Sequence, residues 1–325
     1  MKKTLVSGIK PTGKLHIGNY FGAMRQIVAL QEKYDNFVFI ANYHALTTQQ
    51  PREELEDNTL DLAASYLAVG IDPEKTTLFL QSNVPEVTEL AWIFESITTM
   101  PYLMRAHAFK DALAKEKEVN AGLFNYPMLM AADILIQNAD VVPVGADQKQ
   151  HVEIARDTAE KFNRLFGTTF VLPEPLILED VKTIIGTNGQ KMSKSYNNVI
   201  GLFDKYEEIK KAVMSISTDS KGVEEPKNPE TCNVFTIHKL FGTKKELSAL
   251  ETRYREGKIG YKESKELLIE KIEHFIKPLR QKRKEILENK GKLKIILKNG
   301  GERARERAMQ KMQEVRKKIG LSIYD

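Results

Sequence analysis

The stretch Pro11-Thr12-Gly13-Lys14-Leu15-His16-Ile17-Gly18-Asn19 joins the first predicted strand to the first predicted helix. In an open α/β sheet, phosphate-bearing ligands bind at this turn, against the free N–H groups of the helix start. Gly18 has no side chain, so a nucleotide can lie close to the backbone there. His16 can donate a hydrogen bond to a phosphate oxygen, although an ordinary loop histidine is the alternative interpretation, and this short pattern alone does not choose between them.

The segments around this stretch alternate between strand and helix patterns. Short runs rich in β-branched or aromatic residues predict strands, and apolar residues three and four positions apart predict the helices between them. This rhythm is typical of a parallel sheet with crossover helices. The sequence therefore predicts an α/β fold with a Rossmann-like, doubly wound parallel sheet, its strands at 4–8, 37–42 and 76–81 and its first helices at 19–32 and 52–69.

Beyond the third strand the pattern changes twice. A charged segment, 101–120, has few strand signals and is interpreted as an insertion, and after Leu202 the chain is helical apart from a connector at 221–233. Further helices are expected at 86–99, 125–137 and 147–166, and further strands at 141–144 and 183–195, the last running into a polar loop. The predicted domains are a catalytic domain at 1–200, a helical domain at 201–290 and a basic helical tail at 291–325 that packs back on the first.

Composition narrows the class of protein. The single cysteine, Cys232, excludes a disulfide within the chain and argues against a cysteine-based metal site. No apolar run reaches the ~18 residues of a membrane-spanning helix, and the start of the chain lacks a secretory pattern, so a cytoplasmic protein is expected. Residues 271–325 hold 17 Lys and Arg against 7 Asp and Glu, in a chain of net charge +5. This basic end suits a polyanion partner, although a solvated helix face explains the charge run by itself.

A second motif, Lys191-Met192-Ser193-Lys194-Ser195, follows the polar stretch Gly186-Thr187-Asn188-Gly189-Gln190. Two lysines three positions apart on a flexible loop suit a triphosphate whose charge must be held during transfer. Most lysine-rich loops are only solvated turns, so the motif is informative mainly in combination. One signature at each half of a doubly wound sheet, in this order, favours a nucleotide-using enzyme.

With both signatures the chain resembles the class I aminoacyl-tRNA synthetases, and further blocks match the tryptophan enzymes of bacteria. The blocks are Tyr126-Pro127, Leu129-Met130-Ala131-Ala132-Asp133-Ile134-Leu135 and Val142-Pro143-Val144-Gly145-Ala146-Asp147-Gln148. The resemblance runs along the whole chain. It implies that tryptophan attacks the α-phosphate of ATP, that pyrophosphate leaves, and that the acyl group then passes to the 3′ end of the tRNA. Positioning and charge stabilisation suffice for this chemistry, so no covalent nucleophile is needed.

The resemblance also implies roles for single residues. Two sets act on ATP and on the reaction: the expected catalytic residues are His16, Gly18, Asn19, Lys191, Ser193, Lys194 and Ser195, and the expected ATP contacts add Lys10, Pro11, Thr12, Gly145, Ala146, Asp147, Ile184 and Met192. Lys191, Ser193 and Lys194 would hold the departing pyrophosphate, and Ile184 would lie near adenine. Mg²⁺ would accompany ATP, held mainly by phosphate oxygens.

The expected tryptophan site centres on Asp133, which would accept the indole N–H from within an otherwise apolar helix. A surface carboxylate is the usual alternative, but the apolar neighbours three and four positions away leave little room for it. Met130 and Val144 would pack on the ring, or serve as plain core. The other expected contacts are His44 beside the indole, Tyr126 and Gln148 at the ammonium group, and Val6.

Four positions depart from the family's usual pattern. Lys10 replaces a neutral residue, Val6 replaces a common Phe, Ala146 replaces a Glu, and Ala112 stands where many relatives carry an ATP-contacting lysine. Lys115 or Lys117 is a candidate to replace that lysine. These changes affect the expected affinities more than the expected reaction.

The resemblance implies partners as well. The helical domain would recognise the anticodon, the basic tail would meet tRNA phosphates, and the protein would form a homodimer. Three alternatives were weighed: a tyrosine–tRNA ligase, a non-catalytic synthetase-like RNA-binding paralogue, and a small nucleotidyltransferase. The specificity blocks disfavour the first, the signature lysines the second, and the helical domain the third.

Overall fold

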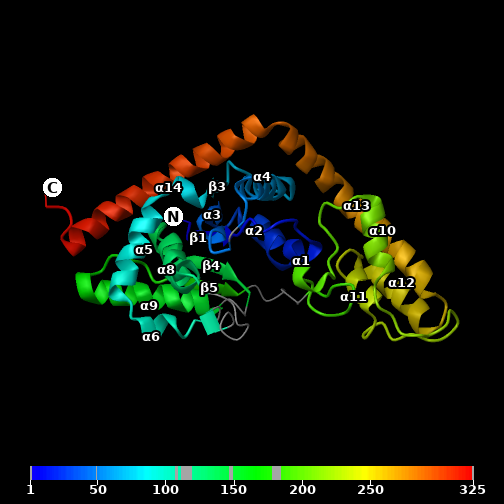
Figure 1. The fold of residues 1–325 in the computed structure, drawn as a ribbon. Coiled ribbons are helices and arrows are strands. Elements are labelled where there is room, and N and C mark those ends of the chain that lie inside the picture. The colour runs from blue at the N-terminus through cyan, green and yellow to red at the C-terminus, as the bar shows by residue number, and fades with distance from the viewer. Residues whose placement is uncertain are drawn as a thin grey trace. The chain divides into compact units, whose positions relative to one another are not determined.

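The computed structural model describes residues 2–48, 50–106, 109–110, 119–145, 149–177 and 184–323. The chain divides into two compact units (Figure 1). The first comprises Met1–Gly13, Ile27–Leu178 and Ile286–Asp325, and the second comprises Lys14–Gln26 and Glu179–Glu285. This division differs from the expected domain bounds, because the turn after the first strand groups with the later part of the chain.

A five-stranded sheet forms the centre of the first unit. Its strands are β1 (Thr4–Ile9), β2 (Asp35–Ile40), β3 (Thr76–Leu80), β4 (Val141–Val144) and β5 (Glu174–Ile177). They lie in the order β3-β2-β1-β4-β5, and every neighbouring pair is parallel. The chain thus builds outward from β1 in one direction and then in the other, which confirms the doubly wound parallel sheet.

The helices of the first unit surround this sheet. They are α3 (Asn42–Ala45), α4 (Arg52–Ala68), α5 (Glu86–Ile97), α6 (Met100–Leu103), α8 (Ala121–Ile136) and α9 (Lys149–Phe166), with a 3₁₀ helix at Gln81–Asn83. The main core joins α5, α8 and α9 through buried aromatic side chains, including Phe94, Phe162 and Phe170, whose rings meet edge to face. Burying such rings is a large source of stability.

The basic tail forms one long helix, α14 (Lys290–Ile319), in the same unit as the sheet (Figure 1). A Cβ at Gly300 would collide with the carbonyl oxygen of Leu78 on β3, so only glycine allows the helix to come this close. Ion pairs fix the contact further along, with Arg305 Nε 2.8 Å from Glu86 Oε1. Some positive charges of the tail are therefore paired with acidic residues of the same unit.

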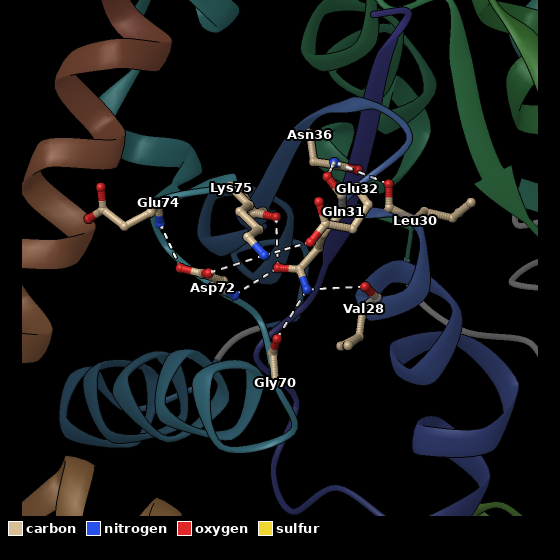
Figure 2. A network of polar contacts seen from close by, with 10 residues as sticks. Val28, Leu30, Gln31, Glu32, Asn36, Gly70, Asp72, Glu74 and Lys75 are labelled. Atoms are coloured by element: carbon tan, nitrogen blue, oxygen red, sulfur yellow. Dashed lines mark hydrogen bonds and ion pairs between the residues drawn. The ribbon is translucent and has the colours of Figure 1, made fainter.

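The buried side chain of Gln31 links the segment that precedes β2 to the segment that leads into β3 (Figure 2). Gln31 Oε1 accepts hydrogen bonds from the Asp72 N–H at 2.7 Å and from Thr76 Oγ1 at 3.1 Å. Its Nε2 donates to the carbonyl oxygens of Val28 and Gly70, each at 3.1 Å. Every hydrogen-bonding group of this side chain is thereby engaged inside the protein, as a buried amide requires.

The second unit is helical. It contains α1 (Ile17–Asn19), a π-helical turn at Tyr20–Met24, a 3₁₀ turn at Lys194–Tyr196, α10 (Tyr206–Met214), α11 (Asn233–His238), α12 (Lys244–Arg255) and most of α13 (Tyr261–Glu288). The helix expected at 19–32 is present as a continuous helical run from Ile17 to Leu30, in which the π-helical turn joins α1 to α2 (Arg25–Leu30). Across the described ranges, no helix has the length and apolar character needed to span a membrane.

One predicted strand is wrong, and one observed strand was not predicted. Among residues 184–195, which are the described part of the expected strand 183–195, the structure has only an isolated bridge between Ile185 and Lys191, because the segment folds back on itself. The fifth strand is β5 instead, and it was missed. Pro173 and Pro175 hide its pattern, since proline in a sequence argues against a central strand, and β5 lies at the edge of the sheet, where proline is tolerated.

Candidate active site

Asp133 lies on α8, and its carboxylate is buried, with 4% of the residue exposed. The residues on either side, Ala132 and Ile134, are buried core. Asp133 is therefore not a surface residue, although carboxylates on helices usually are. Burial raises the pKa of Asp133, and hydrogen bonds from His44 and Gln81 act in the opposite direction.

Two donors reach this carboxylate. His44 Nε2, on α3, lies 2.9 Å from Asp133 Oδ2. Gln81 Nε2, just after β3, lies 2.9 Å from Oδ1 and 2.8 Å from Oδ2. His44 and Asp133 were predicted as one site, but Gln81 was not predicted. It directly follows β3, at the carboxyl end of the parallel sheet, where α/β folds place their binding residues, and this position was the available signal.

Among the other expected tryptophan contacts, Tyr126 lies beside His44 in the first unit. The rings of His44 and Tyr126 are 6.3 Å apart, centre to centre, and the Tyr126 hydroxyl lies 2.7 Å from His151 Nε2. Three apolar residues belong to one hydrophobic cluster: Val6 is fully buried in it, and Met130 and Val144 pack against it from half-buried positions. Gln148 lies outside the described residues. His151 is a polar neighbour that the sequence analysis did not predict.

Part of the expected ATP set also belongs to the first unit. Lys10 Nζ donates to Thr47 Oγ1 at 3.0 Å, and burial lowers the pKa of Lys10. The Thr12 N–H donates to the Lys10 carbonyl oxygen at 2.9 Å, after the buried Pro11. Gly145 follows the end of β4. Four of the positions named above, Ala112, Lys115, Lys117 and Ala146, lie outside the described residues, as does Asp147.

The first signature motif, His16-Ile17-Gly18-Asn19, forms a tight turn in the second unit. The Asn19 N–H donates to the His16 carbonyl oxygen and the His16 N–H donates to Asn19 Oδ1, both at 2.9 Å. A Cβ at Gly18 would lie 2.8 Å from His16 Nδ1 and 3.4 Å from Met192 Sδ. Gly18 therefore sits between the two signatures, where a side chain would not fit.

His16 is buried, and its Nδ1 has no hydrogen-bond partner in the described part of the chain. Burial, together with the charge of Lys194, lowers the pKa of His16 to about 4. The imidazole is therefore neutral near pH 7 and can donate one hydrogen bond without carrying charge. Lys194 lies close enough to act on His16 electrostatically, which links the two signature motifs within one unit.

The second signature is a loop that is fixed through its backbone and exposed at its side chains. The Met192 N–H donates to the Ile184 carbonyl oxygen at 2.8 Å, and the buried Met192 anchors the loop. Lys191, Lys194 and Ser195 are exposed, and Ser193 Oγ lies 2.8 Å from Ser195 Oγ. Partial loss of hydration lowers the pKa of Lys194, although its side chain remains accessible.

Asn198 is the residue that shapes this loop, and the sequence analysis missed it. It is buried, its Oδ1 accepts the Ser193 N–H at 2.8 Å, and its Nδ2 donates to Asn188 Oδ1 at 2.7 Å and to the Lys191 carbonyl oxygen at 3.1 Å. A Cβ at Gly186 would collide with Asn198. Gly186 therefore serves close packing as well as the loop flexibility expected of it.

The chain is similar in sequence and in fold to known proteins. The family described as "tRNA synthetases class I (W and Y)" matches residues 2–277. The tryptophan–tRNA ligase of Fusobacterium nucleatum is 50% identical over 327 residues, covering 100% of both chains. The crystal structure of the Campylobacter jejuni tryptophanyl-tRNA synthetase, complexed with ADP and tryptophan, is 49% identical, covers 98% of this chain and 100% of its own, and has a TM-score of 0.93.

The tyrosine branch of the family is more distant. The tyrosyl-tRNA synthetase from Archaeoglobus fulgidus, complexed with L-tyrosine, is 20% identical with a TM-score of 0.67, covers 87% of this chain and 90% of its own, and shares the fold. Identity of about half over the full chain to tryptophan enzymes separates the two branches. The chain therefore belongs to the class I aminoacyl-tRNA synthetases, ATP-dependent ligases, and within them to the bacterial-type tryptophan–tRNA ligases.

Proposed function

We propose that the chain activates L-tryptophan with ATP to give tryptophanyl-adenylate and pyrophosphate, and then transfers tryptophan to the 3′ end of its tRNA. In the first step a carboxylate oxygen of tryptophan bonds to the α-phosphorus of ATP while the bond to the departing pyrophosphate breaks. In the second, a ribose hydroxyl of the tRNA takes the acyl group and AMP leaves. The protein binds and orients the substrates and stabilises the charge on the phosphates, without forming a covalent intermediate.

The buried Asp133 carboxylate is the observation that carries the choice of amino acid. A carboxylate held at 4% exposure among apolar residues is costly unless a ligand or neighbours satisfy it. An indole N–H supplies a neutral donor of the required kind, whereas a substrate without this donor leaves the carboxylate underused. Around it, His44, Met130, Val144 and Val6 would contact the ring, and Tyr126 and Gln148 would bind the ammonium group.

The two signatures supply the groups proposed for ATP. In the second unit, Gly18 allows close approach of a nucleotide, the neutral His16 donates to a phosphate oxygen, and Asn19 orients that turn. Lys191, Ser193, Lys194 and Ser195 hold the departing pyrophosphate, while Met192 anchors the loop and Ile184 lies near adenine. In the first unit, the proposed ATP contacts are Lys10, Pro11, Thr12, Gly145, Ala146 and Asp147.

We further propose that Mg²⁺ arrives with ATP. Among the residues that the structure describes, no three His, Cys, Asp or Glu side chains cluster as metal ligands would. The donors at the signature loops are instead ammonium, hydroxyl and backbone N–H groups, which suit phosphate oxygens. Phosphate oxygens would then hold the ion, whose charge would add to that of the lysines at the pyrophosphate.

For the second substrate we propose that the helical part of the second unit recognises the anticodon and that the exposed cations of α14 contact tRNA phosphates. The net charge of +10 over residues 271–325 supports the contact with tRNA phosphates. Arg305, Arg307 and Arg316 contribute less to it, because each already forms an ion pair with an acidic residue. A homodimer in the cytoplasm, as the family resemblance implies, completes the proposal.

One assay tests the proposed reaction: exchange of labelled pyrophosphate into ATP in the presence of each of the twenty amino acids in turn. Tryptophan alone should support exchange. Exchange with tyrosine instead would assign the chain to the tyrosine branch by activity. An absence of exchange with every amino acid would make the protein a non-catalytic relative that binds RNA.

A further inference from the structure

Gln81 uses both ends of its buried amide to connect two elements of the first unit. It opens the 3₁₀ helix Gln81–Asn83, directly after β3, and is 1% exposed. Its Oε1 accepts the backbone N–H groups of Tyr43 at 3.0 Å and His44 at 3.2 Å. Its Nε2 donates to Asp133, with 2.9 Å to Oδ1 and 2.8 Å to Oδ2. One side chain thereby couples α3 to the carboxylate on α8.

The donors around Asp133 are unevenly shared between its two oxygens. An ionised carboxylate offers about four acceptor positions, two on each oxygen. Oδ2 faces both His44 Nε2 and Gln81 Nε2, whereas within the described ranges Oδ1 faces Gln81 only. Both positions on Oδ2 are therefore used, and one remains on Oδ1.

We propose that Gln81 is a positioning residue for the amino-acid substrate, which orients the Asp133 carboxylate so that Oδ1 keeps one acceptor position for the indole N–H. This inference rests on the proposed role of Asp133. Without the amide, His44 alone holds the carboxylate through Oδ2, and Oδ1 becomes free to turn. Part of the binding free energy of tryptophan is then spent on ordering the carboxylate, and selection for the N–H weakens.

The most informative variant is Gln81→Glu. It keeps an oxygen for the Tyr43 and His44 N–H groups and replaces the donor toward Asp133 by a second carboxyl group. Two carboxyl groups at this distance do not both ionise easily, so the pair keeps one proton at low pH, and that proton forms the hydrogen bond between them in place of the amide N–H. When the proton is lost, the two charges repel and Oδ1 is no longer held in place.

The assay is pyrophosphate exchange between pH 6 and 9.5 with tryptophan and with 3-benzothienylalanine, in which sulfur replaces the indole N–H. For Gln81→Glu, we expect the KM for tryptophan, relative to the parent at the same pH, to rise about 10- to 100-fold toward the alkaline end, as when a hydrogen bond to a charged group is lost. The preference for tryptophan over the analogue should fall in parallel. His44 and Asp133, which face this position, are present in both proteins, so comparison with the parent at each pH removes the pH dependence that the two proteins share.

A second variant, Gln81→Met, removes the donor at every pH while keeping a similar volume. It should lose the preference for the N–H across the whole range, without the recovery at low pH that Gln81→Glu shows. A merely structural role for Gln81 predicts otherwise: the two variants would differ in stability and would keep the parent's preference. That result, parental selectivity in both variants from pH 6 to 9.5, would overturn the inference.

Gln31→Glu is the matched control (Figure 2). Gln31 is also a buried glutamine of the first unit whose Oε1 accepts a backbone N–H, from Asp72, but its Nε2 donates to carbonyl oxygens and has no part in the site. The variant should lose stability and keep the parent's KM and selectivity. A selectivity loss equal to that of Gln81→Glu would show that general loosening of the unit explains both.

Asp133→Ala, which leaves no side-chain acceptor for the indole N–H, tests the proposed role of Asp133 separately from the inference about Gln81. If this variant selects tryptophan over the analogue as well as the parent does, the proposed role of Asp133 fails, and the inference fails with it. If Asp133→Ala loses selectivity while both Gln81 variants retain it, Asp133 binds the indole but Gln81 does not position it. Loss of selectivity in all three variants supports both.

Discussion

The residues proposed for tryptophan and those proposed for pyrophosphate lie in contrasting surroundings. In the first unit, Val6, His44 and Asp133 are buried, and hydrogen bonds from His44 and Gln81 hold the carboxylate. In the second unit, Lys191, Lys194 and Ser195 are exposed on a loop that is held by its backbone and by Asn198. The residues proposed for tryptophan are preorganised, whereas the loop proposed for pyrophosphate is fixed through its backbone and has Lys191 and Lys194 on its exposed side.

The contrast matches what each substrate demands. Selecting one aromatic side chain by a single N–H requires a dry, rigid acceptor, because water or a mobile carboxylate would satisfy other donors equally well. Holding a departing pyrophosphate requires cations that follow the growing charge, and lysine is a movable point charge. The predictions below test this division of roles.

The largest effect is expected at Lys194. A lysine that meets the leaving group as charge develops adds more to the transition state than to ground-state binding. We expect Lys194→Ala to slow adenylate formation by ~10²- to 10³-fold, the size seen when one preorganised charge stabiliser is removed. Single-turnover kinetics should show little change in the KM for tryptophan and a smaller effect on transfer to tRNA, since pyrophosphate has already left.

Two outcomes would contradict this role for Lys194. An unchanged first step would make the loop a solvated basic turn. Equal slowing of both steps would indicate general damage to the loop rather than loss of contact with pyrophosphate.

The next largest effect is expected at Asp133. Asp133→Ala removes a buried, charge-assisted hydrogen bond and should cost ~2–4 kcal/mol in tryptophan activation. The affinity for ATP, measured separately, should barely change. A variant that activates tryptophan as well as the parent would show that Asp133 does not hold the indole, and the buried carboxylate would then need another explanation.

A third test concerns acid stability of the second unit. His238 is fully buried, its Nε2 lies 3.0 Å from the Ser264 carbonyl oxygen, and burial lowers its pKa to about 4. The unfolded histidine, with a pKa of ~6.5, binds a proton that the folded one does not. Stability is therefore lost as the pH falls from about 6.5 toward about 4, by about 2 kcal/mol between pH 7 and 5 for this residue.

Denaturant unfolding followed by circular dichroism checks the acid effect at pH 7 and pH 5, in the parent and in His238→Gln. The glutamine keeps a donor near Ser264 and does not titrate. The variant should lose less of its unfolding free energy on acidification than the parent, with His16 contributing to both. An equal loss would assign the acid sensitivity to other groups.

The smallest effect is expected from salt. If three or so phosphate contacts come from exposed cations of the tail, charging should weaken roughly tenfold between 50 and 150 mM salt, because phosphate contacts release counterions. Adenylate formation, which needs no tRNA, should change less. Equal salt dependence of the two steps would remove the tail from tRNA binding and leave it as a structural helix.

The sequence predicted most of the fold because its signals were local. Strands such as Thr4–Ile9 and Thr76–Leu80 carry their pattern within a few residues, and the helix Lys149–Phe166 follows its apolar spacing. The edge strand Glu174–Ile177 was missed because Pro175 contradicts the usual propensity. The strand expected at 183–195 was wrong because polar loop residues fold back through Asn198, a contact that no local pattern reveals.

The candidate site shows the same limit. Asp133 stood out because a carboxylate interrupts an apolar helix, and the signature motifs stood out by their order. Gln81 and Asn198 gave no such signal, since each acts through backbone groups and side chains that are distant in sequence or form a loop only on folding. Residues that position a site are therefore harder to predict than those that touch the ligand.

We infer that recognition of tryptophan and handling of pyrophosphate are separate tasks of separate units. The most direct test measures kcat/KM for tryptophan in pyrophosphate exchange for the parent, Asp133→Ala, Lys194→Ala and the double variant. Independent tasks predict that the two free-energy losses add, to within about 0.5 kcal/mol. This inference would be contradicted if kcat/KM of the double variant were no lower than that of the less active single variant, because the two residues would then act as one.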